Sequence, residues 1–181
     1  MAREVALYEI PKNLEVAKVL DDSMLNEYND SVKSVYNSDK ARVVLNKFRT
    51  QNGELTGSNI PMLVHLQNSG LLKGARIATR QDLETALRFN PNIFSGNYVD
   101  FGLALRTAGD SYLPNDLLAK NLARQFKDRG IEHGKGKLIP ISALVLREDA
   151  NSDYGLVFDL NDSVKDIEDL SQFKWNYSAK Q

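Results

Sequence analysis

The chain of 181 residues contains no cysteine, and this absence removes several kinds of site at once. Without a thiol there is no disulfide, no thiolate metal site, no iron–sulfur cluster and no cysteine nucleophile. Histidine is nearly as scarce, since His65 and His133 are the only two. Neither has a second histidine or a carboxylate at the spacing of a helical metal site, so the sequence predicts no metal and no cofactor. We expect His65, between Val64 and Leu66, to be a partly buried structural residue.

Long apolar runs and a charge excess of one sign are also missing. No run approaches the roughly 20 apolar residues of a membrane-spanning helix, and Glu4 and Glu9 interrupt the N-terminal apolar stretch, which argues against a signal peptide. The net charge is −1, so there is no general positive field to attract nucleic acid or a membrane surface. We therefore expect a soluble cytoplasmic protein without membrane contact. Any binding of nucleic acid would need a local basic patch.

The composition is that of an ordinary globular protein, with 42% hydrophobic and 26% charged residues. No repeat or long linker divides the chain, which predicts a single domain over residues 1–181. The pattern changes near Asn90: residues 1–90 read as mainly helical, and residues 91–181 read as strand, helix, strand, strand. This order predicts an α+β fold in which a helical N-terminal half packs on a small mixed sheet formed mainly by the C-terminal half.

Local signals in the N-terminal half predict where its elements begin. A short strand is expected at 4–10, a short helix at 14–20, and a longer helix from Asp22 or Ser23. Ser38 can cap the next helix, and Ser58 a short one that tolerates Pro61 in its first turn. The apolar positions of the helix after Ser38 are Ala41, Val44, Leu45 and Phe48.

Another N-terminal signal lies at Thr79, which precedes Asp82 by three residues and so resembles a capping box. The helix that follows is expected to bury Leu83, Ala86 and Leu87. A helix-turn-helix built from the helices at 38–51, 58–67 and 79–89 is a weaker alternative. The third helix carries acidic residues that a DNA phosphate would repel.

Strands are predicted at 98–106, 138–146 and 154–160, with a helix at 114–129. Pro140 conflicts with a continuous strand at 138–146, because it cannot donate to a strand ladder. A bulge, or a strand that begins after Pro140, would resolve the conflict. In the last strand one face is expected to carry Tyr154, Leu156, Phe158 and Leu160. Phe173, Trp175 and Tyr177 suggest a docked C-terminal tail.

The strongest candidate for binding is a basic stripe on the helix at 114–129, continued by the residues that follow it. Its five cations are Lys120, Arg124, Lys127, Lys135 and Lys137. Such a cluster could hold the phosphates of RNA, DNA or a nucleotide. The alternative is a solvated helix face whose charge Asp116 and Asp128 partly compensate at a spacing of four residues.

Two other patterns give weaker evidence for a binding site. Gly134-Lys135-Gly136-Lys137 follows a helix, precedes a strand and lacks the Ser or Thr of a phosphate loop, so we interpret it as a flexible connection. Tyr98, Asp100 and Arg106 share the non-core face of the strand at 98–106 and could line a shallow groove. The alternative is that another element packs on that face.

These observations favour a non-enzymatic soluble interaction or assembly module of unknown partner, or one that self-associates. The sequence shows no catalytic constellation, and several faces with small or aromatic residues could meet a partner. The alternative is a phosphate or nucleic-acid binding protein that uses the basic stripe. A hydrolase built from Asp and His residues that only the fold brings together is a third hypothesis.

Overall fold

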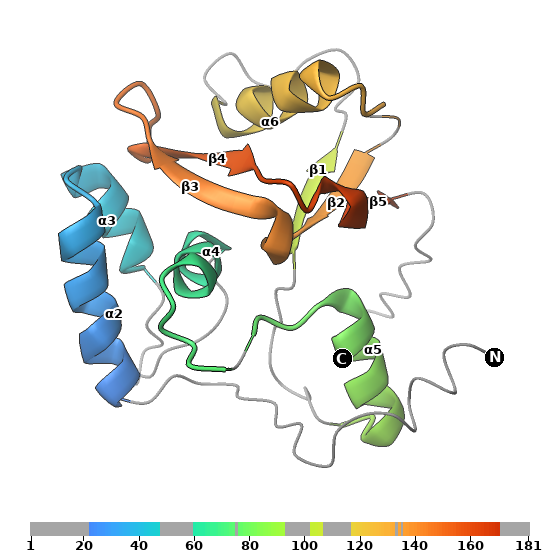
Figure 1. The fold of residues 1–181 in the computed structure, drawn as a ribbon, viewed down its shortest axis with the longest axis horizontal. Helices are drawn as coiled ribbons and strands as arrows, with labels where there is room; N and C mark the ends of the chain where they lie inside the picture. The colour runs from blue at the N-terminus through green and yellow to red at the C-terminus, as the bar shows by residue number, and fades with distance from the viewer. Residues whose placement is uncertain are drawn as a thin grey trace.

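The structure is a computed structural model, and it describes residues 22–47, 60–74, 76–92, 102–106, 117–132, 134 and 136–170. Helices α2 to α5 precede the first described strand, α6 lies between β1 and β2, and the sheets are antiparallel, which confirms the α+β class (Figure 1). The helices are α2 (Asp22–Val35), α3 (Asp39–Leu45), α4 (Ile60–Asn68), α5 (Arg80–Phe89) and α6 (Leu117–Asp128). The strands are β1 (Gly102–Arg106), β2 (Gly136–Pro140), β3 (Leu144–Glu148), β4 (Leu156–Leu160) and β5 (Glu168–Asp169). The predicted strand at 4–10, the helix at 14–20 and the aromatic tail lie outside the described residues.

The strands form two small sheets, one with the order β1-β2-β5 and one that pairs β3 with β4. Every pairing between described strands is antiparallel, where we expected a mixed sheet. In the second sheet Arg147 lies opposite Val157, and Val145 opposite Asp159. This register makes Arg147 of β3 and Asp159 of β4 diagonal neighbours on the sheet.

Pro140 divides the strand that the sequence predicted at 138–146. It is the last residue of β2, and a 3-10 turn (Ile141–Ala143) follows it before β3 begins. A residue without an N–H is tolerated at the end of a strand, where the ladder stops. The run is apolar throughout because both sheets contribute to the core: Ile139 and Leu144 are fully buried.

The helices cover the β3–β4 sheet from two sides. α4 packs against β3 and the 3-10 turn after β2, and α6 packs against β4. Figure 1 shows α4 below and α6 above this sheet. Fully buried side chains join the layers: Met62 and Leu66 from α4, Leu122 and Phe126 from α6, and Leu156 from β4. None of the described helices has the length and apolar character needed to cross a membrane.

The predicted caps of α3 and α5 are confirmed. Ser38 Oγ accepts from the N–H of Ala41 at 3.3 Å. Thr79 and Asp82 form a complete capping box, because each side chain accepts from the backbone N–H of the other. Both devices depend only on residues three apart, so the sequence alone could predict them.

The predicted burial of Leu87 and the predicted place of Tyr154 in the last strand are wrong. Leu87 is 41% exposed, whereas Leu83 is buried. The ion pair of Arg80 with Glu168 of β5 ties the first turn of α5 to the sheet, and Leu87 lies a turn beyond Leu83. Tyr154 is 51% exposed because it lies in the turn before β4, where Gly155 has a φ of +72° and breaks the extended alternation.

Candidate functional site

The structure places the first part of the basic stripe on the solvent side of α6. Lys120, Arg124 and Lys127 are exposed, and the opposite side of the helix is buried through Ala119, Leu122 and Phe126. Arg129, just after the helix, donates to the backbone oxygens of Leu160 and Asn161 at 2.8 Å each. Its charge therefore holds the helix end against the strand.

The five predicted cations do not form one surface. Lys137 lies on β2 and makes an ion pair with Asp169 of β5, with only 13% of its side chain exposed. Lys135 lies outside the described residues. Of the four that the structure describes, Lys120 and Arg124 line a common hollow, and Lys127 and Lys137 do not line it.

This hollow has a volume of about 430 Å³ and is bounded by α6 on one side and the β3–β4 sheet on the other. We call it the α6–β3 hollow. Lys120 and Arg124 line it together with Arg147 of β3. The rest of its lining consists of Leu117, Asn121, Asp149 and Val157.

Asp159 of β4 organises the charged side chains beside this hollow. Its carboxylate accepts from Arg147 Nε at 2.8 Å, from Asn121 Nδ2 at 2.9 Å and from Gln125 Nε2 at 2.9 Å. Burial alone would raise the pKa of Asp159, but these hydrogen bonds outweigh it and hold the pKa below its ordinary value. Gln125 also accepts from the N–H of Leu160 at 2.7 Å, so the same contacts fasten α6 to β4.

The two arginines of the hollow are both held in place. Arg124 Nη2 donates to Asn121 Oδ1 at 2.7 Å. Arg147 is held mainly by its hydrogen bonds to Asp159, which raise its pKa. Its Nη1 lies 3.6 Å from Asp149 Oδ2, which is beyond the usual hydrogen-bond range.

Arg147 is the cation of the lining that sequence reasoning missed. It follows directly after the predicted strand at 138–146, and the run that it begins, residues 147–153, resembles a calcium loop only slightly, without the D-x-[DN]-x-[DN]-G order or the closing Glu. It reaches the helix only because β3 pairs with β4 and α6 packs on β4.

The predicted groove can be described only in part. Tyr98 and Asp100 lie outside the described residues, and so does the side chain of Arg106. The backbone of Arg106 ends β1, opposite Gly136 of β2. Ala104, on the same face of the strand, is exposed.

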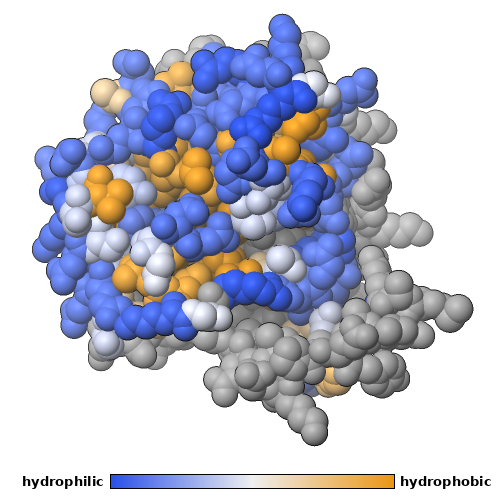
Figure 2. All heavy atoms as spheres, in the orientation of Figure 1, coloured by the Kyte–Doolittle hydropathy of each residue, from blue (hydrophilic) through white to orange (hydrophobic). Residues whose placement is uncertain are grey.

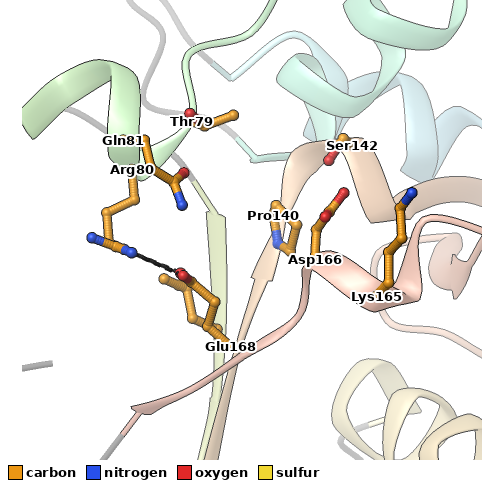
Figure 3. A pocket seen from close by; sticks show the side chains of 9 residues that line it. Thr79, Arg80, Gln81, Pro140, Ser142, Lys165, Asp166 and Glu168 are labelled. Atoms are coloured by element: carbon orange, nitrogen blue, oxygen red, sulfur yellow. Dashed lines mark hydrogen bonds and ion pairs between the residues drawn. The ribbon is translucent and has the colours of Figure 1, made fainter. Parts of the chain in front are cut away.

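A second hollow of about 370 Å³ lies between the start of α5 and the end of β2 (Figure 3). Figure 3 shows Arg80 and Gln81 on one wall and Pro140, Ser142 and Asp166 on the other. The Arg80 guanidinium donates to both carboxylate oxygens of Glu168, at 3.1 and 2.8 Å, and also to Glu84. Two carboxylates therefore already compensate its charge.

His65 is a structural residue of the core. It is 4% exposed, and its ring nitrogens lie 2.9 Å from Ser31 Oγ and 3.2 Å from the Tyr36 hydroxyl. Burial lowers the pKa of His65. Across the part of the chain that the structure describes, no group of three or more His, Asp or Glu side chains could hold a metal ion.

Comparison with known proteins gives no match: no family model, curated protein or solved structure is similar enough to relate to this chain.

Proposed function

We propose that the protein is a non-enzymatic interaction module that self-associates weakly through one corner of its surface. The corner, which we call the α3 corner, consists of Val35 at the end of α2, Val43 on α3 and Tyr154 in the β3–β4 turn. These large apolar side chains are 55%, 55% and 51% exposed. Large exposed apolar side chains on elements that meet in the fold are candidates for a contact surface.

Contacts between the segment before α3 and the β3–β4 hairpin support the view that the α3 corner is one rigid surface. Glu148 Oε1 accepts from the N–H groups of Asn37 and Ser38, at 2.7 Å each. Gly155 lies so close to Ser38 that an added Cβ would stand 2.5 Å from its Oγ. The β3–β4 turn thus packs on the start of α3, as Figure 1 shows. Tyr154 is next to Gly155 in the chain. Val35 precedes Asn37 and Ser38 in the chain, and Val43 follows them.

The charges beside the corner favour a second copy of the chain as the partner. Lys40 of α3 and Asp153 of the turn are both exposed there. A two-fold contact can bring Lys40 of one copy opposite Asp153 of the other, twice by symmetry. The apolar area is small, and Figure 2 shows separate apolar areas on a mostly hydrophilic face. An interface well below the roughly 1,200 Å² of stable complexes associates weakly.

Sedimentation velocity over a wide range of protein concentration tests this proposal. We expect a reversible monomer–dimer equilibrium that K40E and D153K each weaken and that the double variant K40E/D153K restores. The two single variants change the net charge in opposite directions, so a shared effect points to a local pair. F89S is the matched control, because Phe89 is 67% exposed on α5, away from the corner. A monomer at all concentrations, or a loss caused by F89S alone, would overturn the proposal.

One observation favours a second candidate function, the binding of phosphate groups. Lys120 and Arg124 of the predicted stripe line the α6–β3 hollow together with Arg147. Fluorescence anisotropy with short single-stranded RNA and DNA tests whether the whole stripe is used. Binding along the stripe weakens steeply with salt, with a slope that grows with the number of phosphates contacted.

A further inference from the structure

We propose that the α6–β3 hollow binds a single phosphate group of a small ligand, held by Lys120, Arg124 and Arg147. This inference rests on the second candidate function and narrows it from an extended nucleic-acid surface to one site. It also adds Arg147, from a strand, to residues that the sequence located on a helix.

The position of the three cations suits one compact anion. Lys120 and Arg124 are four residues apart on α6, so they project from neighbouring turns of the same face. Arg147 approaches from the other wall of the hollow, whose volume of about 430 Å³ is within the range of small-molecule sites. Arg147 uses Nε and Nη2 for Asp159, and Arg124 uses Nη2 for Asn121, so each of the five-donor guanidinium groups keeps N–H groups that can donate to a phosphate oxygen.

Both guanidinium groups are positioned before any ligand arrives. Asn121 holds Arg124, and Asn121 itself donates to the backbone oxygen of Phe158 at 2.5 Å and to Asp159. Asp159 also holds Arg147 through Nε and Nη2. Side chains that are already ordered lose less conformational entropy on binding.

The charge around the hollow fits a single phosphate better than a polyanion. Three cations and two carboxylates, Asp149 and Asp159, lie at the hollow or beside it. Lys127 does not line the hollow, and Lys137 is paired with Asp169 on the other sheet. Asp149 does line it and would repel an anion, so its removal should strengthen binding rather than weaken it.

Titration of the full chain with inorganic phosphate at low salt, followed by calorimetry and by amide chemical shifts, tests the site. R124Q should weaken binding about tenfold, as expected for the loss of one charge-assisted hydrogen bond, and K120Q should weaken it similarly. D149N should tighten binding. K127Q is the matched control: it removes the same charge from the same exposed helix face, and it should leave phosphate binding unchanged.

The outcomes separate this site from the broader function. If K127Q weakens phosphate binding as much as R124Q, the attraction is a diffuse field and the proposed site is wrong. If RNA binds in a way that needs Lys127 while inorganic phosphate does not bind, the single-phosphate site is wrong and the second candidate function stands. If neither RNA nor inorganic phosphate binds at low salt, the single-phosphate site and the second candidate function are both wrong.

Discussion

Mild acid should destabilise the fold through His65. The ring is buried between α4 and α2, where Ser31 and Tyr36 face its two nitrogens and the rings of Tyr28 and Tyr36 meet it edge-on. Across the described part of the chain, no carboxylate makes an ion pair with this ring. Burial raises the pKa of the Tyr36 hydroxyl to about 12, and the negative charge of Glu148 adds to this shift. The hydroxyls therefore stay neutral, and a protonated His65 would be a buried cation without an anionic partner.

The direction of the effect follows from proton linkage. Burial lowers the pKa of His65 in the folded state below its ordinary value near 6.5. Below that pH the unfolded chain binds a proton that the folded chain does not, so stability is present above about pH 6.5 and is lost as the pH falls toward the folded pKa. Because one group exchanges at most one proton, the loss cannot exceed about 1.4 kcal/mol per pH unit.

Urea denaturation at several pH values between 5.5 and 8 measures this loss. H65Q should lower stability at pH 7.5 by about 3 kcal/mol, because it removes two hydrogen bonds and the ring contacts, and it should also flatten the dependence on pH. H133Q, which changes the other histidine of the chain, is the control and should retain the dependence. If the slope persisted in H65Q or vanished in H133Q, the reasoning would be refuted.

Two further predictions concern the contacts that position the surfaces described above. G155A should destabilise the protein by more than about 2 kcal/mol, because the new Cβ would stand 2.5 to 2.8 Å from Ser38, Lys40 and Ala41 at a φ of +72°. G130A has a similar φ of +69° but no atom within 4 Å, and should cost only about 1 kcal/mol; equal losses in urea denaturation would contradict the close packing of the turn on α3. D159N should lower the free energy of unfolding by about 1–2 kcal/mol in the same assay. Arg147 would lose its ionic partner, and the asparagine has one acceptor oxygen where the aspartate has two. An unchanged stability would show that Asp159 does not fasten α6 to β4.

Local signals in the sequence predicted the elements well. The caps at Ser38 and Thr79 and the conflict at Pro140 all involve neighbours within a few residues, and the structure agrees with each. Predictions that extended a helical period or a strand alternation to the end of an element were wrong at two residues. Leu87 fits the apolar period of α5 but is exposed, and Tyr154 fits the alternation of β4 but lies in a turn.

The sequence by itself determined the α+β class, the starts of α3 and α5 and the exposed basic face of α6, because periodicity and capping are properties of short segments. Only the tertiary structure decided which charged residues meet. The antiparallel register of β3 and β4 puts Arg147 and Asp159 within hydrogen-bonding distance, and the packing of α6 on β4 adds Lys120 and Arg124. The same packing separates Lys137 from them and pairs it with Asp169. Contacts between residues tens of positions apart depend on sheet register and layer packing, which spacing along the chain does not encode.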